Sequence, residues 1–347
     1  AADAFGLLSW YGAETAGSLT LLPPDAPANA GAEALRTLSD AELSQRIRQL
    51  PRVPLTHGAV KRMSLAGAQH KLAVVMRDGV LYEPSGASAS LHILKPEHPD
   101  PDYPHSVANE WFVMRLAAES GLAVPPVHRR YVPEPAYIVD RFDRIVRNGK
   151  IERLHAIDAC QLLGLDRSFK YQQGSIANLS RLADACRSPA VARTRLFTWV
   201  VFNVLTGNGD AHLKNLSFLI TGAGVQLAPH YDLISTIVHE SRAFDKPDWP
   251  QSTHLAWPIL DARRFAEVDR QLMIAAGVEL GLNRGTAERL LDECRRRIVP
   301  AAEHVYAAFE ARTGEAGLQS PATRAGEARC LRAIIHAVIR EMTERLS

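Results

Sequence analysis

The sequence predicts an α+β protein of two lobes, a small lobe rich in β-strands followed by a large helical lobe. Between about residues 61 and 142, short apolar runs alternate with turn signals, which is the pattern of strands. After about residue 145, apolar residues recur mostly at helical spacing to the end of the chain. A length of 347 residues is sufficient for two domains, each with its own core.

Residues 1–55 are predicted to form an accessory N-terminal segment rather than a domain. They are rich in alanine, and Pro23 and Pro24 interrupt them. Helical spacing begins at Asp40 and extends to Leu50, where Ser39 could cap the first turn.

The small lobe is predicted to cover residues 56–142. It contains one helix, Asn109–Ser120, which Gly121 and the prolines after Val124 bring to an end. Its predicted strands are Lys71–Met76, Val80–Glu83, Leu91–Leu94 and Tyr137–Val139.

The large lobe is predicted to cover residues 143–347. Two short apolar runs, Ser217–Ile220 and Val225–Leu227, predict a pair of strands joined by a glycine-rich turn. The other predicted elements of this lobe are the helices Ala156–Leu163, Arg193–Thr206, Asp261–Ala276, Thr286–Val299, Ala301–Thr313 and Gly326–Leu346.

Composition excludes several classes of protein. With 46% hydrophobic and 22% charged residues, the chain is not disordered overall. A net charge of +2 provides no strong positive field, so any contact with nucleic acid would have to be local. The longest apolar run, Leu196–Leu205, is half the roughly 20 residues of a membrane helix, so we expect a cytoplasmic protein without a membrane partner.

The cysteines and tryptophans are expected to be structural. The cysteines form no CxxC pair and no cluster with histidine at zinc spacing, so buried thiols are predicted. The residues concerned are Cys160, Cys186, Cys294 and Cys330, and three tryptophans, Trp111, Trp199 and Trp257, are predicted to lie in the core.

The stretch Thr206–Leu216 carries the strongest chemical signal. It places Asp210 five positions before Asn215, directly after an apolar helix and before a predicted strand. Phosphoryl transfer needs a carboxylate that accepts the proton of the attacking hydroxyl, and oxygen ligands that hold Mg²⁺ on the phosphates. Kinase catalytic loops have these residues at this spacing.

A second candidate metal ligand, Asp232, follows the predicted strand pair. It lies seventeen positions after Asn215, and a hairpin between the two would bring it back beside Asn215. An Asp and an Asn at this spacing are common at turns, but the hairpin and the later Asp favour a kinase-type site with Asn215 and Asp232 as ligands.

Two further residues of the small lobe fit a nucleotide site. Lys95 ends a short apolar strand, where a kinase lysine contacts the phosphates of ATP. Glu110, fifteen positions later at the start of the predicted helix, could orient that lysine. The alternatives are a solvated lysine and an acidic residue that interacts with the helix dipole.

A loop of small residues precedes the first strand of the small lobe. The stretch Met63–Lys71 allows backbone N–H groups to approach phosphate oxygens closely, although it is neither a Walker A motif nor the usual kinase glycine loop. The stretch Val139–Asp143 is predicted to be the hinge that offers backbone groups to adenine. A charged linker is the alternative for that stretch.

These motifs, in this order, resemble the HipA-family serine/threonine kinases, the toxins of bacterial HipBA toxin–antitoxin systems. The resemblance implies a two-lobed, protein-kinase-like fold and the cofactors ATP and Mg²⁺. The matching stretches are SLAGAQHK (64–71), HILKP (92–96), NEWFVMRLAAESGLAVP (109–125), VDRFDR (139–144), RLHAIDACQLLGLDRSFKYQ (153–172), GNGDAHLKNLSFLI (207–220) and LAPHYDLIS (227–235).

The resemblance also implies roles for individual residues. Asp210 would be the catalytic base, Asn215 and Asp232 the Mg²⁺ ligands, and Ser64 an autophosphorylation site that switches the kinase off. A phosphate on Ser64 cannot remain where the ATP phosphates bind, because it carries a charge of about −1.5 to −2. The implied ATP-binding residues are Ser64, Ala66, Gly67, Ala68, Gln69, Lys71, Lys95, Asp140, Phe142, His212 and Lys214.

Partners and substrate are implied by the same resemblance. Members of the family phosphorylate translation proteins such as aminoacyl-tRNA synthetases, and a HipB-like helix-turn-helix antitoxin neutralises them and binds operator DNA. Only Phe5–Leu22 resembles the N-terminal subdomain of full-length members. We therefore expect either a truncated chain or a short HipT-like form that pairs with a separate HipS-like protein.

Two other functions are compatible with parts of the pattern. A small-molecule phosphotransferase of the aminoglycoside type shares the Asp, Asn and second Asp, but Ser64 would have no role in it. An inactive kinase fold that serves as a corepressor with a helix-turn-helix antitoxin is the other alternative. The presence of all three groups needed for Mg-ATP chemistry argues against that inactive form.

Overall fold

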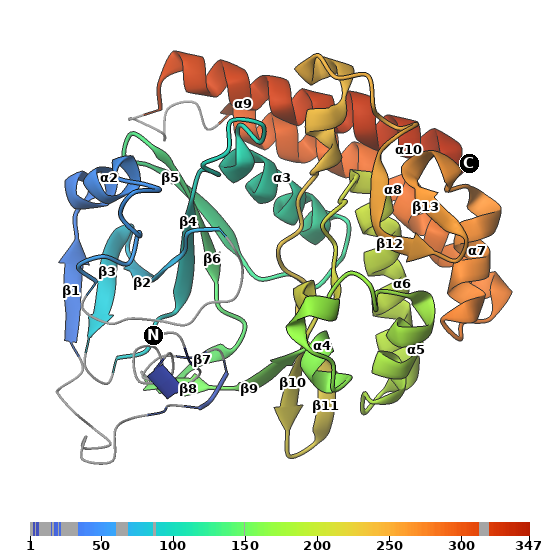
Figure 1. Cartoon of the computed structure of the whole chain (residues 1–347), viewed down its shortest axis with the longest axis horizontal. Coiled ribbons are helices and arrows are strands. Elements are labelled where there is room, and N and C mark those ends of the chain that lie inside the picture. The colour runs from blue at the N-terminus through green and yellow to red at the C-terminus, as the bar shows by residue number, and fades with distance from the viewer. Residues whose placement is uncertain are drawn as a thin grey trace. The chain divides into compact units, whose positions relative to one another are not determined.

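The computed structural model of the chain describes residues 3, 5–6, 15, 17–19, 21, 34–59, 69–85, 88–148, 150–311 and 319–347. The chain divides into two compact units, whose elements are labelled in Figure 1. The first unit comprises Ala1–Val107, Pro125–Ala156 and Ala316–Ser320, and the second comprises Ala108–Val124, Ile157–Glu315 and Pro321–Ser347.

A six-stranded antiparallel sheet forms the centre of the first unit, with its strands in the order β1-β3-β2-β4-β6-β5 (Figure 1). Four of these strands lie where apolar runs predict them. The sequence does not predict β5, because its middle residues are His128, Arg129 and Arg130. The strands are β1 (Ala34–Leu38), β2 (Leu72–Arg77), β3 (Val80–Ser85), β4 (His92–Pro96), β5 (Val127–Tyr131) and β6 (Pro135–Asp140).

Residues 34–59, expected to be part of an accessory segment, are integrated into this sheet and its core. Strand β1 pairs antiparallel with β3. Helix α2 (Asp40–Arg48) begins where the sequence predicts, because Oγ of Ser39 accepts a hydrogen bond from the N–H of Glu42 at 3.2 Å. Three leucines of this region join the core of the unit, namely Leu38, Leu43 and Leu55.

Three short strands follow β6 in a region where the sequence predicts mainly helix. They are β7 (Arg144–Arg147), β8 (Lys150–Arg153) and β9 (His155–Asp158), and β7 and β8 form an antiparallel hairpin. Their sequences are too charged to show an apolar run. The boundary between the two units accordingly follows Ala156, later than the predicted lobe boundary at residue 142.

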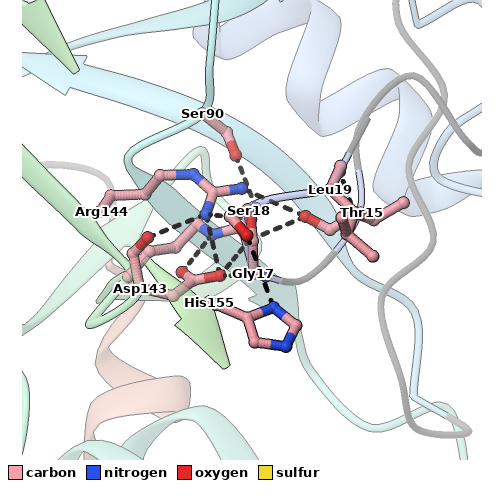
Figure 2. Close-up of polar contacts among 9 residues, drawn as sticks. Thr15, Gly17, Ser18, Leu19, Ser90, Asp143, Arg144 and His155 are labelled. Carbon is pink, nitrogen blue, oxygen red and sulfur yellow. Dashed lines mark hydrogen bonds and ion pairs between the residues drawn. The ribbon is translucent and has the colours of Figure 1, made fainter. Parts of the chain in front are cut away.

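A buried ionic cluster connects the start of this region to the N-terminal segment, as Figure 2 shows. The carboxylate of Asp143 accepts two hydrogen bonds from Arg141, at 2.9 and 2.8 Å, and one from Nη1 of Arg144 at 2.9 Å. Oδ2 of Asp143 also accepts a hydrogen bond from the N–H of Gly17 at 2.8 Å. Nη2 of Arg144 donates to the carbonyl oxygen of Thr15 at 3.1 Å, so two buried arginines and one carboxylate fix this segment to the unit.

The second unit is mainly helical and also contains two pairs of strands. The pairs are β10 (Ser217–Thr221) with β11 (Gly224–Leu227), and β12 (His254–Ile259) with β13 (Ala262–Arg264). Strand β9 extends the first pair in the order β11-β10-β9.

Helix α3 (Ser106–Glu119) crosses the boundary into the second unit. The remaining α-helices are α4 (Ala159–Leu162), α5 (Ile176–Asp184), α6 (Pro189–Thr206), α7 (Arg270–Glu279), α8 (Arg284–Ala311), α9 (Pro321–Ala333) and α10 (Arg340–Arg345). Short 3-10 helices cover Arg167–Phe169, Leu213–Asn215, Ile237–Glu240, Arg242–Phe244 and Phe265–Glu267, and a π-helical turn covers Ile334–Ile339.

Four predicted helices differ from the structure, two of them because they form the single helix α8. The first half of Ala156–Leu163 is strand, and α4 begins only after Asp158, which caps it. The helix predicted from Asp261 begins at Arg270, because β13 and a 3-10 helix occupy the intervening residues. Finally, α8 continues through Pro300, because apolar residues before and after the proline are buried along the same helix.

The predicted structural residues are largely buried. Trp111, Trp199 and Trp257 are all buried, as expected for core residues. All four cysteines are free thiols, and Cys294 alone among them is partly exposed. None of the helices within the described ranges combines the length and apolar character that crossing a membrane requires.

We predict that Asp143→Asn destabilises the chain by about 3 to 5 kcal/mol at pH 7, because it removes the negative charge that accepts hydrogen bonds from two buried arginines, Arg141 and Arg144. Burial alone would raise the pKa of Asp143, but the hydrogen bonds from Arg141 and the nearby positive charges outweigh it and hold the pKa below its usual value. The carboxylate therefore contributes stability above about pH 4, the pKa of an unfolded Asp, and loses it as the pH falls towards the folded value.

Urea denaturation at several pH values measures this effect. The difference in the free energy of unfolding between wild type and Asp143→Asn should narrow below about pH 4. The control, Asp102→Asn at an exposed position of the same unit, should change the free energy of unfolding little. If wild type remains more stable than Asp143→Asn by the same free energy of unfolding down to pH 2.5, this assignment is contradicted.

Candidate active site

The second unit positions the stretch that contains Asp210 by ending α6 sharply at Gly207. This glycine has φ +64° and ψ +49°, a left-handed backbone conformation that is unfavourable for residues other than glycine. A Cβ atom at this position would lie 2.7 Å from Cγ1 of Val338 and 3.3 Å from Cβ of Ile237. The chain therefore leaves the buried helix in a fixed direction and begins the loop 207–216.

The loop is held in place by the side chain of Asn208. Its Nδ2 donates to Oδ1 of Asn203 on α6 at 2.8 Å, and its Oδ1 accepts from the N–H of Asp210 at 3.0 Å. Beside it, the N–H of Gly209 donates to Oγ1 of Thr236 at 2.8 Å. These bonds fix the main chain of Asp210 while its side chain remains exposed.

Asp210 and Asn215 are brought together by the main chain of Asp210. Its carbonyl oxygen accepts hydrogen bonds from the N–H of His212 at 2.8 Å and from Nδ2 of Asn215 at 3.0 Å. The bond to Asn215 uses the amide nitrogen, so Oδ1 of this buried side chain is the atom that can coordinate a cation.

The hairpin of β10 and β11 returns the chain to this loop, as the sequence predicts. After the hairpin, the N–H of Ala228 donates to the carbonyl oxygen of Ser217 at 2.9 Å. The hydroxyl of Tyr231 then donates to the carbonyl oxygen of Lys214 at 2.9 Å. The next residue, Asp232, has φ +54°, a left-handed conformation that is uncommon among non-glycine residues.

One imidazole lies in the electrostatic field of both carboxylates. His212 is buried, and burial lowers its pKa, while the negative charges of Asp210 and Asp232 act in the opposite direction. Among the described residues, Nδ1 of His212 is buried without a hydrogen-bond partner. The two carboxylates are therefore within electrostatic range of the same ring, beside a buried polar atom that is left unsatisfied.

This set of donors fits Mg²⁺ on a nucleotide better than a metal held by protein alone. In the described ranges, no group of three or more His, Cys, Asp and Glu side chains could hold a metal ion. Mg²⁺ bound to phosphates needs only one or two oxygen ligands from the protein, and water and phosphate complete its shell. The sequence predicts Asn215 and Asp232 as such a pair.

The other predicted nucleotide-binding residue of the second unit, Lys214, is engaged elsewhere. Its ammonium forms an ion pair with the carboxylate of Asp158, the residue that caps α4. This contact fastens the loop to α4.

The predicted nucleotide residues of the first unit that the structure describes lie in β4 and β6 or in sequence next to β2 and β6. Lys95 is buried at the end of β4, with Nζ 5.5 Å from the ring centroid of Tyr137. Nε2 of Gln69 donates to the carbonyl oxygen of Pro96 at 3.1 Å. At the end of β6, Oδ1 of Asp140 lies 3.2 Å from Nε2 of His128.

The remaining predicted positions carry less information. Lys71 and Phe142 are half-buried, and Glu110 is buried on α3 in the second unit, so its pairing with Lys95 stays a prediction. Ser64, Ala66, Gly67 and Ala68 lie outside the described residues.

Two residues that contact the loop were not predicted to have a role there. The hydroxyl of Tyr171 donates a hydrogen bond to Oδ1 of Asp210. Nε1 of Trp257 donates to the carbonyl oxygen of Ala211 at 2.8 Å, so this core tryptophan also supports the loop. Both are far from the loop in sequence, and no local pattern connects them to it.

The family of HipA-like C-terminal domains matches residues 63–302, and the chain belongs to this family. A relative named putative kinase Y4mE, from Sinorhizobium fredii, is 36% identical over 317 residues, which are 87% of this chain and 73% of that protein. The serine/threonine-protein kinase toxin HipA of Shewanella oneidensis is 35% identical over 261 residues, which are 69% of this chain but only 58% of that protein. The chain is thus a member of a family whose named relatives are kinases.

Solved structures agree on the fold. A chain from the complex of HipA, HipB and operator DNA of Shewanella oneidensis MR-1 matches 99% of this chain and 81% of its own length, with a TM-score of 0.76 and 28% identity. The Helicobacter pylori proinflammatory kinase CtkA matches 81% of this chain and 93% of its own, with a TM-score of 0.53 and 14% identity, a likeness of fold alone. The chain has an α+β, kinase-like fold, as predicted.

We predict that Gly207→Ala destabilises the chain by about 2 to 3 kcal/mol, because alanine is disfavoured at φ +64° and its Cβ collides with Val338. Urea denaturation measures the change. The control is Gly285→Ala on α8, where the nearest atom to a new Cβ is 3.8 Å away and alanine should be neutral or stabilising. Equal stability of the two variants would contradict the constraint at Gly207.

Proposed function

We propose that the chain is an ATP-dependent serine/threonine protein kinase in which Asp210 is the catalytic base and Asn215 and Asp232 hold Mg²⁺. The observation that supports this most directly is the loop closed on the carbonyl oxygen of Asp210, which accepts hydrogen bonds from the N–H of His212 and from Nδ2 of Asn215. Membership of the HipA-like family supports the same assignment.

In this proposal the residues of the chain divide the work of phosphoryl transfer. The exposed carboxylate of Asp210 accepts the proton of the attacking hydroxyl as its oxygen bonds to the γ-phosphorus and the bond to ADP breaks. Asn215 and Asp232 would hold Mg²⁺, which when bound would supply positive charge where negative charge develops on the phosphates. Buried and with a lowered pKa, His212 adds no second positive charge at neutral pH.

We assign the remaining nucleotide contacts to the first unit. Lys95 would contact the ATP phosphates, and the backbone near Asp140 and Phe142 would contact adenine. The loop from Ser64 to Ala68, with Gln69 and Lys71, would enclose the phosphates, His212 and Lys214 would border the site, and Glu110 would orient Lys95. Phosphorylation of Ser64 would switch the kinase off, because the new charge competes with the ATP phosphates.

We also propose that this kinase is the toxin of a toxin–antitoxin module. A relative is named as a kinase toxin, and a similar solved structure contains HipB and operator DNA. By analogy, the partner of this chain would be a HipB-like helix-turn-helix antitoxin that carries it to operator DNA, with a HipS-like protein as a further candidate. Its substrate would be a translation protein, with an aminoacyl-tRNA synthetase as the first candidate.

We predict that the dephosphorylated full chain, incubated with Mg-ATP, gains the mass of one phosphate, which peptide mapping places on Ser64. Asp210→Ala should lose this gain, because no carboxylate remains to accept the hydroxyl proton. Asp261→Ala, at an exposed position between β12 and β13, is the matched control and should keep it.

The same incubation, carried out with and without an added aminoglycoside, distinguishes the proposal from its alternatives. A wild-type chain that binds Mg-ATP and never gains phosphate would support an inactive corepressor. Phosphate transfer to an aminoglycoside, without any transfer to protein, would support a small-molecule phosphotransferase. Either result would overturn the proposed protein-kinase activity.

A further inference from the structure

The loop between α4 and α5 places a tyrosine directly on the candidate base. The hydroxyl of Tyr171 donates a hydrogen bond to Oδ1 of Asp210, 39 positions later in the chain. Among the described residues, this is the one side-chain hydrogen bond that the carboxylate of Asp210 accepts. Both side chains are exposed, with Tyr171 38% accessible, so the contact lies where a substrate can reach it.

Several contacts fix Tyr171 relative to the loop that carries Asp210. The N–H of Leu213 donates to the carbonyl oxygen of Lys170 at 3.1 Å. The ring of Tyr171 meets that of His212 edge to face, with centroids 5.1 Å apart and planes at 76°. On the same ring, Nζ of Lys170 lies 4.6 Å from the centroid, within the range of a cation–π contact.

The loop of Tyr171 also packs on the tryptophan that supports the loop of Asp210. The N–H of Gly174 donates to the carbonyl oxygen of Tyr171 at 2.9 Å. A Cβ atom on Gly174 would lie 2.4 Å from Cγ of Trp257, so the backbone can approach the indole only because this residue is glycine. Trp257 in turn donates to the carbonyl oxygen of Ala211, so both loops are fixed to the same side chain.

The hydrogen bond holds a side chain that is otherwise free to rotate. The main chain of Asp210 is fixed by Asn208 and Asn215, but its carboxylate projects into solvent. A base in several rotamers spends only part of its time aligned with an acceptor hydroxyl, and misplacement by about 1 Å can cost two orders of magnitude in rate. A hydrogen bond to one carboxylate oxygen selects one rotamer and leaves the second oxygen available.

The phenol remains a donor at the pH at which a kinase works. Burial raises the pKa of Tyr171, and the hydrogen bond to the carboxylate of Asp210 raises it further. A neutral phenol can donate its proton in a hydrogen bond to Asp210 without competing for the role of base.

We propose that Tyr171 is a positioning residue for phosphoryl transfer: its hydroxyl binds Oδ1 of Asp210 and thereby directs Oδ2 to the hydroxyl of the protein substrate. This inference rests on the proposed kinase function. It adds to that function a residue outside the loop 207–216. Through Tyr171, the segment between α4 and α5 would control the alignment of the base.

The test is Tyr171→Phe in the dephosphorylated full chain, with autophosphorylation followed over a range of Mg-ATP concentrations. Phenylalanine keeps the ring contacts with His212 and Lys170 and removes only the hydroxyl. We expect the maximal rate to fall about tenfold, and the half-saturating ATP concentration and the melting temperature to stay the same, since only the alignment of the base is lost. The matched control, Tyr103→Phe at an exposed tyrosine of the other unit, should leave the rate unchanged.

Several outcomes would overturn this inference while leaving the kinase intact. If Tyr171→Phe is as fast as wild type, the hydroxyl does not position the base, and if the variant is faster, the hydroxyl instead occupies the place of the acceptor. A phosphate found on Tyr171 of the wild type would make it an acceptor. A fall in rate matched by a fall in melting temperature would assign it a structural role. If the wild type transfers no phosphate at all, the proposed function itself fails.

Discussion

The left-handed end of α6 at Gly207 is the constraint on which the candidate site depends. It ends a buried helix and sends the chain into a loop that closes on itself, because the carbonyl oxygen of Asp210 accepts two hydrogen bonds from residues further along. A Cβ at Gly207 would collide with Val338, so the turn and the packing around it require the same residue. The hydrogen bond from Asn215 to the carbonyl oxygen of Asp210 closes the loop and fits the spacing of five positions between them. The hairpin of β10 and β11 then leads the chain to Asp232.

Much of the fold could be predicted from the sequence, where an apolar pattern was present. The central strands, α6 and the hairpin of β10 and β11 have such patterns, and the structure contains them. Strands β5, β7 and β8 lack such a pattern, because charged residues interrupt their apolar residues. Conversely, Pro300 predicts a helix break that the buried apolar residues on both sides of it prevent.

The loop with Asp210 could be predicted because its essential geometry is local: two residues five positions apart and a short hairpin. The supports of that loop could not, since Tyr171 and Trp257 approach it from segments 39 and 46 positions away. Trp257 was expected in the core and is there, but its Nε1 also holds the loop. For Lys214, the motif predicts a contact with the phosphates of ATP, but in the structure its ammonium forms an ion pair with Asp158.

The central claim is that Asn215 and Asp232 share one cation on a nucleotide next to the carboxylate of Asp210. Crystals grown with Mn²⁺ and a non-hydrolysable ATP analogue test this directly, because anomalous scattering locates the metal independently of the protein model. The account predicts a single strong anomalous peak in coordination contact with Oδ1 of Asn215, the carboxylate of Asp232 and the analogue's phosphates. Bound analogue with its metal away from both side chains would contradict it.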